Sequence, residues 1–117
     1  MTLEGLPVHA NGVRVIRADG ELDVVSVPPL LPGLAELVAG AAAVVLDLTA
    51  VSFFDSSGVR LVDRLARVAR GAGAGFRVVA PPGTASRRVL EVVGMDRLVD
   101  DDVPAAVTAA ARLDGGR

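Results

Sequence analysis

The sequence predicts an α/β fold in which a hairpin is followed by parallel strands and crossover helices. Apolar runs of strand length alternate along most of the chain with stretches that repeat at helical spacing. The 117 residues, of which 51% are hydrophobic and 22% charged, fit one globular domain with a substantial core. We therefore expect a single domain over residues 1–117, with its core over about residues 3–113.

The start of the chain predicts the hairpin. A strand over residues 3–9 and a β-branched strand over residues 13–17 flank Asn11-Gly12, a dipeptide typical of tight hairpin turns. Because Pro7 has no backbone N–H, the first of these strands is expected at an edge of the sheet.

A turn and a helix are expected next. Asp19-Gly20 predicts a turn that ends the second strand. The apolar spacing after Ser26 predicts a helix that reaches Gly40, with Ser26 or a neighbour as its N-cap and with prolines tolerated in its first turn.

The rest of the chain alternates between strands and helices. A continuous apolar run is typical of a strand buried on both faces, and an apolar stripe opposite an arginine-rich face is typical of a surface helix. Val89, Leu90 and Val93 form such a stripe, and Gly94 lies where that helix would end. The expected elements are a strand over residues 43–48, a helix over 56–71, a strand over 76–80, a helix over 84–93, a strand over 97–99, a helix over 103–113 and a tail over 114–117.

The composition excludes most classes of enzyme. The chain has no Cys, and its 12 basic residues are all Arg, so thiolate chemistry, Cys-bound metals, a phosphate-loop lysine and a Schiff-base lysine are excluded. His9 is the single histidine. The net charge of −2 and the scarcity of aromatic residues argue against nucleic-acid binding. We expect no enzyme activity, no cofactor, no metal and no nucleic-acid partner.

The hydropathy pattern argues against membrane insertion. No apolar stretch reaches the ~18 residues that a spanning helix needs, and the N-terminal residues lack the basic region of a secretory signal. We therefore expect a cytoplasmic protein.

The segment Asp55-Ser56-Ser57 joins a predicted strand to the clearest predicted helix. Asp55 or Ser56 is placed to cap that helix, whose N-terminus offers free N–H groups and a partial positive charge. A phosphoryl group on a hydroxyl there would be accommodated without unfolding the helix. The simpler interpretation, which the residue types alone favour, is an ordinary N-cap.

Two other kinds of chemistry are weaker candidates. A nucleophile elbow requires Gly two residues before its serine, where Phe54 precedes Ser56. The two carboxylates of Gly20-Glu21-Leu22-Asp23 predict a solvated turn rather than an acid–base pair. Because loops that follow the strands of an α/β sheet gather at one edge, Asp23 is expected near Asp55 and Ser56.

Arg60 begins a basic stripe along the same helix. The stripe is interpreted as a solvated face with an i,i+4 pair between Asp63 and Arg67, and the alternative is a surface for an acidic partner.

Four segments in register resemble a STAS domain, in particular the free-standing bacterial anti-sigma-factor antagonists. The resemblance runs from about Val13 to the last helix, and its most specific part is Asp-Ser-Ser-Gly. It implies a mixed sheet of four to five strands with about four helices packed on it. The four segments are Gly20-Glu21-Leu22-Asp23, residues 45–48, residues 53–58 and residues 88–95.

The resemblance also implies a switch that regulates transcription. The unphosphorylated protein would bind an anti-sigma factor with a serine kinase fold and release a sigma factor. The kinase would phosphorylate Ser56 and end the complex, and a metal-dependent serine phosphatase would reset it. Asp23 matches the family's acidic residue beside the phosphorylation site, and Ser57 and Gly58 match helix-start positions at the interface. The expected partner-binding residues are Asp23, Asp55, Ser57, Gly58 and Arg60.

A second function is compatible with the same fold. STAS domains also serve as docking subunits of membrane lipid or anion transport systems, in which Ser56 would be only a helix cap. The intact Asp-Ser-Ser-Gly favours the antagonist. Pro28, Pro29 and Pro32 depart from the family's pattern and are expected to shift or shorten the first helix. We expect a monomer, with a dimer as the alternative.

Overall fold

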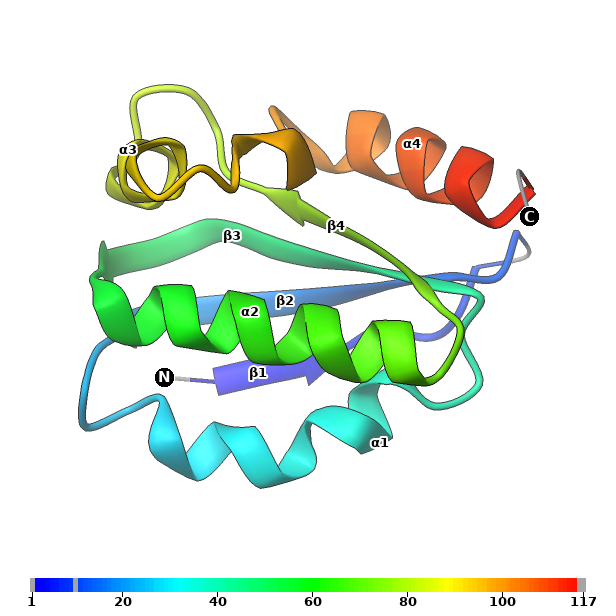
Figure 1. Ribbon diagram of the computed structural model, residues 1–117, viewed down its shortest axis with the longest axis horizontal. Coiled ribbons are helices and arrows are strands. Elements are labelled where there is room, and N and C mark those ends of the chain that lie inside the picture. The colour runs from blue at the N-terminus through cyan, green and yellow to red at the C-terminus, as the bar shows by residue number, and fades with distance from the viewer. Residues whose placement is uncertain (1, 10, 116–117) are drawn as a thin grey trace.

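The computed structural model describes residues 2–9 and 11–115, which fold around one sheet with helices on both faces (Figure 1). Within these residues the sheet has five strands in the order β1-β2-β3-β4-β5, and four α-helices accompany it. The α/β class with a mixed sheet is therefore confirmed. The strands are β1 (Thr2–Gly5), β2 (Val13–Leu22), β3 (Ala43–Phe54), β4 (Gly75–Val79) and β5 (Val99–Asp100). The α-helices are α1 (Leu34–Val38), α2 (Ser56–Gly71), α3 (Ala85–Val92) and α4 (Val103–Gly115). Two short 3₁₀ helices are labelled η1 (Pro28–Gly33) and η2 (Asp96–Leu98).

The strand pairing follows the predicted order of a hairpin and then crossovers. β1 lies antiparallel to β2 at the edge of the sheet, and the pairings of β2 with β3, β3 with β4 and β4 with β5 are parallel. Each parallel connection passes through at least one helix, as parallel strands require.

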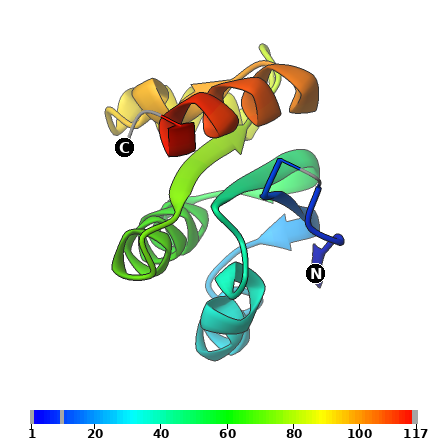
Figure 2. The same cartoon turned by 90° about the vertical axis from the view of Figure 1, so that its right-hand side faces the viewer.

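Two apolar clusters occupy the two faces of the sheet. On one face, α1 and α2 cover alternate strand residues that include Ile16, Leu46 and Val78. On the other, Ala106 and Ala110 of α4 pack on the intervening strand residues. Figure 2 shows α4 on the opposite side of the sheet from α1 and α2. The period-two alternation of a strand explains why neighbouring residues of β2 and β3 enter different clusters. The second cluster consists of Val13, Val15, Ala43, Val45, Val79, Ala106 and Ala110.

The hairpin differs from its prediction in length. β1 ends at Gly5, so Pro7 lies beyond the strand, although the Leu6 and His9 N–H groups still donate to β2 at 2.9 and 2.8 Å. The turn predicted at Asp19-Gly20 is wrong, because β2 continues to Leu22. Gly20 has a φ of +91° at a register shift against β3, a conformation that glycine adopts without strain.

The helix predicted from Ser26 to Gly40 is shorter and begins later. The segment Pro28–Gly33 forms a 3₁₀ helix, and α1 has only 5 residues. Pro32 lies inside the 3₁₀ helix, where its missing N–H and its ring prevent an α-helical turn. The expected shortening is confirmed. Of the expected caps, the neighbour Val27 occupies the N-cap position of η1 without a side-chain hydrogen bond, whereas the Ser26 hydroxyl donates to the Glu21 carbonyl.

Most of the later elements lie where the sequence places them, with shifted ends. β3 extends past residue 48 to Phe54, and α2 and α4 begin as expected. The strand predicted over residues 97–99 is wrong for residues 97 and 98, which belong to η2, and the strand is Val99–Asp100. α4 continues to Gly115, so the first two residues of the predicted tail are helical, and residues 116–117 lie outside the described part of the chain. Val93, placed on the apolar stripe of α3, is instead 48% exposed because α3 ends at Val92.

Candidate functional site

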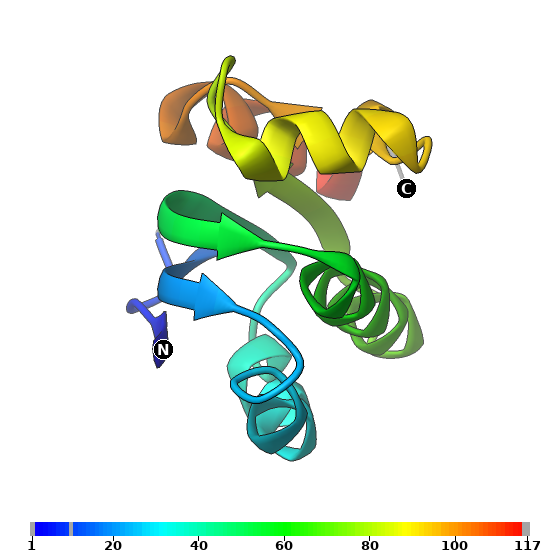
Figure 3. The ribbon, with the colours of Figure 1, turned by 90° about the vertical axis from the view of Figure 1, so that its left-hand side faces the viewer.

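The carboxyl ends of β2 and β3 place the candidate residues side by side. Leu22 of β2 pairs with Phe54 of β3, so Asp23 and Asp55 each follow one member of a hydrogen-bonded register pair. Figure 3 shows both strands ending at the same edge, where β3 continues directly into α2. The proximity of Asp23 to Asp55 and Ser56 that the loop argument predicts therefore follows from the strand register.

Asp55 is the N-cap of α2. Its backbone is extended, and its Oδ1 accepts a hydrogen bond of 2.8 Å from the Ser57 N–H. This bond satisfies one of the free N–H groups at the helix start. Ser56 is therefore the first helical residue, and its side chain is exposed.

Asp23 organises the loop that follows β2. Its Oδ1 accepts hydrogen bonds from the Ser26 N–H at 2.8 Å and the Val25 N–H at 3.0 Å, and the Ser26 hydroxyl accepts one from the Asp23 N–H at 3.0 Å. The backbone hydrogen bond from Ser26 is the main reason that the pKa of Asp23 lies below its ordinary value. The expected solvated turn is thus a half-buried, internally bonded turn, and its carboxylate is ionised beside the start of α2.

Gly58 allows α2 to begin against the end of β3. A Cβ at this position would lie 2.5 Å from Cε1 and 2.6 Å from Cδ1 of the Phe54 ring, closer than real contacts allow. Gly58 is buried and Ser57 is half-buried, whereas Ser56 points outward. The contact between Gly58 and the Phe54 ring therefore fixes the position of the first turn of α2 on β3, a role that the sequence did not predict.

Arg60 lies one helical turn beyond Ser56. The two side chains line the same shallow pocket of about 460 Å³, together with Val59, Asp63, Val93 and Met95. Arg60 is exposed and forms no ion pair with the side chains that the structure describes, those of residues 2–9 and 11–112. At i,i+4 spacing its guanidinium can reach an anionic group on Ser56 or on a bound protein.

Exposed apolar residues surround this edge and were also missed by the sequence analysis. Val24 and Val25, in the loop after β2, are 72% and 78% exposed, and Phe53 beside the helix start is 46% exposed. Apolar side chains that stay in water at the carboxyl ends of two strands are typical of a protein-binding surface. In the sequence, the apolar pair Val24-Val25 directly after the predicted acidic turn could have indicated this exposed surface.

His9 and Ser56, which a serine nucleophile with a histidine base would need together, lie at opposite ends of the sheet. His9 donates its N–H to Val13 at the amino end of β2, whereas Ser56 follows the carboxyl end of β3, roughly 30 Å away for strands of this length. Among the described side chains of residues 2–9 and 11–112, no three His, Asp or Glu residues gather to hold a metal. In the same residues no helix is long and apolar enough to cross a membrane.

The sequence and the fold match known proteins. The model of the STAS domain family matches residues 7–110, so the chain belongs to the STAS domain family. It is 34% identical over 88 residues to the anti-sigma-F factor antagonist RsfB of Mycobacterium tuberculosis, covering 74% of this chain and 70% of that protein.

Two solved structures have a similar fold. The crystal structure of an anti-sigma factor antagonist from Mycobacterium paratuberculosis superposes with a TM-score of 0.74 at 33% identity, over 93% of this chain and 94% of that one. The unphosphorylated anti-sigma factor antagonist SpoIIAA also has a TM-score of 0.74, at 24% identity and 97% coverage of both chains, which supports the fold.

Proposed function

We propose that this protein is an anti-sigma-factor antagonist whose binding to an anti-sigma serine kinase is switched off by phosphorylation of Ser56. The observation that carries the proposal is the exposed hydroxyl of Ser56 at the first position of a helix capped by Asp55. The names of two similar proteins, RsfB and the anti-sigma factor antagonist of Mycobacterium paratuberculosis, support the antagonist class.

The geometry supports a partner surface around Ser56. Val24, Val25 and Phe53 supply exposed apolar area, and Asp23, Asp55 and Arg60 supply charge around it. A kinase partner must bring its bound nucleotide to the Ser56 hydroxyl, and an exposed residue at a helix start is accessible for this transfer. In this proposal the chain acts as a binding protein and as a kinase substrate, and a metal-dependent serine phosphatase restores it.

Phosphorylation would act at the interface by charge. A phosphoserine adds about −1.5 to −2 charges. Two unit charges ~5 Å apart at an effective dielectric constant of ~20 repel by roughly 3 kcal/mol. One partner carboxylate at that range would weaken binding on the order of 100-fold, because each ~1.4 kcal/mol is a factor of ten.

The test compares Ser56→Asp and Ser56→Ala as baits for partners in lysate of the source organism, with and without ATP. We expect wild type and Ser56→Ala to retain an ATP-binding serine kinase and Ser56→Asp to lose it. ATP should release wild type but not Ser56→Ala, and mass spectrometry should find the phosphate on Ser56. The matched control is Thr108→Asp, which adds the same charge on an exposed position of α4.

Two outcomes would contradict the proposal. Equal retention of the kinase by Ser56→Asp and Ser56→Ala would remove the role of Ser56. Capture of a permease or a transport ATPase by every bait would favour a docking subunit of a membrane transport system, with Ser56 as a helix cap only.

A further inference from the structure

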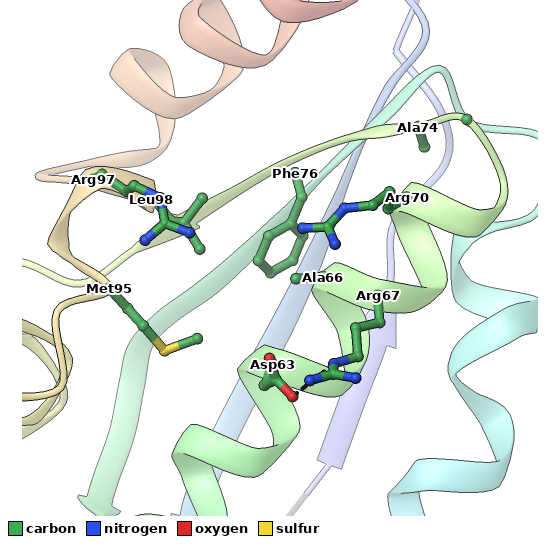
Figure 4. Close-up of a pocket in the computed structure, with 10 residues that line it drawn as sticks. Asp63, Ala66, Arg67, Arg70, Ala74, Phe76, Met95, Arg97 and Leu98 are labelled. Atoms are coloured by element: carbon green, nitrogen blue, oxygen red, sulfur yellow. Dashed lines mark hydrogen bonds and ion pairs between the residues drawn. The ribbon is translucent and has the colours of Figure 1, made fainter.

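A second and larger pocket adjoins the one at Ser56 but is not lined by Ser56. It has a volume of about 630 Å³ and opens between the C-terminal half of α2 and η2, above β4 (Figure 4). Sites for small molecules usually have about 300–1,000 Å³, so the size suits a single small organic ligand. The side chains that matter for its chemistry are those of Asp63, Arg67, Arg70, Phe76, Arg97 and Leu98.

The charged lining of this pocket is mainly positive. Arg67 and Arg70 come from α2 and Arg97 from η2, whereas Asp63 is the single acidic residue of the lining. Asp63 pairs with Arg67 at 3.0 Å, but the two side chains are 49% and 71% exposed, so the pair is weak and can rearrange. Arg70 forms no ion pair with any described residue. An anion would therefore find at least one uncompensated guanidinium.

The floor of the pocket is apolar and aromatic. Phe76 of β4 is only 8% exposed, and Met95 and Leu98 extend the apolar surface beside it. Figure 4 shows the Arg70 and Arg97 side chains reaching over this floor from opposite sides of the Phe76 ring. A ligand would thus meet a flat apolar surface and two guanidinium groups at the same time.

We propose that this pocket binds a small aromatic anion, a molecule with a planar apolar ring and a phosphate or carboxylate group. Guanidinium groups bind both anions with paired hydrogen bonds, and the ring would pack on Phe76 and Leu98. The two pockets adjoin, since Asp63 and Met95 line both, but neither Ser56 nor Arg60 lines this one, so the proposal does not depend on the switch at Ser56.

The test is an NMR titration of the full ¹⁵N-labelled chain with phenyl phosphate and, separately, with phenylacetate. We expect saturable amide shifts confined to residues 63–76 and 94–98, with ligand ring protons close to the Phe76 ring. Arg70→Gln and Arg97→Gln should each weaken binding by about tenfold or more, as expected for a lost charge-assisted hydrogen bond. Arg64→Gln is the matched control, because Arg64 is exposed on α2 outside this pocket.

The matched ligands separate a specific site from general attraction. Inorganic phosphate and benzyl alcohol should each bind much more weakly than phenyl phosphate. Inorganic phosphate that binds as tightly as phenyl phosphate would overturn the proposal. A loss of binding in Arg64→Gln as large as in Arg70→Gln would also overturn it. Either result would mean that anions are attracted to α2 without a specific site. An absence of saturable shifts with both aromatic anions would also overturn it. None of these readouts uses a partner protein, so they leave the proposed switch untouched.

Discussion

Gly58 is the residue on which the shape of the candidate site depends most directly. We expect Gly58→Ala to lower the free energy of unfolding by about 1–3 kcal/mol, because the new methyl group overlaps the Phe54 ring and one of the two must move. The same displacement shifts Ser56, so affinity for the proposed partner kinase should fall as well. Urea unfolding followed by circular dichroism measures the first effect.

Gly71→Ala is the matched control at the other end of the same helix. Nothing lies within 4 Å of a Cβ at Gly71, so alanine should leave stability unchanged or raise it by up to about 1 kcal/mol through its better helix propensity. Equal effects of the two substitutions would show that Phe54 yields freely and that Gly58 is not required for packing.

At the scale of elements, the short helix α1 is held by Arg14 of β2. Arg14 donates from Nη1 to the Leu37 and Ala39 carbonyls at 2.8 and 3.1 Å, and from Nε to the Leu6 carbonyl at 3.1 Å. The N-terminus of α1 has no side-chain cap, so this positive charge at its C-terminal carbonyls is a main polar anchor.

We therefore expect Arg14→Met to destabilise the protein by about 2 kcal/mol, since hydrogen bonds to charged groups contribute about 1.5–3 kcal/mol each. Hydrogen exchange should accelerate at the amides of α1 more than at those of α2. Arg17→Met is the control on the same strand, because Arg17 is exposed and its side chain forms no hydrogen bond to the described residues. An exchange profile of Arg14→Met that matches the control would contradict the anchoring role.

Elements specified by local chemistry were predictable from the sequence, and those set by distant contacts were not. The Asp55 cap, the start of α2 and the gathering of Asp23 with Ser56 follow from capping preferences and from the order of strands. The extension of β3 to Phe54 depends on pairing with β2 across a register shift, which no local pattern contains. The fit of Gly58 on the Phe54 ring depends on tertiary packing in the same way.

At the scale of the whole molecule, the two apolar clusters keep the fold independent of the charge at Ser56. Ser56 is exposed and belongs to neither cluster, and α4 covers the face of the sheet opposite α1 and α2. A change of charge on the Ser56 side chain therefore has no direct packing contact with the opposite face of the sheet.

We accordingly expect Ser56→Asp to leave the structure intact while it abolishes partner binding. A negative charge in the first turn of a helix is favourable by about 0.3–1 kcal/mol, and the neighbouring Asp55 carboxylate offsets part of this. The free energy of unfolding should thus stay constant or rise by up to about 1 kcal/mol.

Amide shifts should be confined to the loop after β2 and the start of α2, whereas Thr108→Asp should shift only α4 and its contacts. Shifts that extend from Ser56→Asp into Ala106 and Ala110 would instead mean that phosphorylation changes the packing of the whole sheet, and the switch would then be conformational rather than electrostatic.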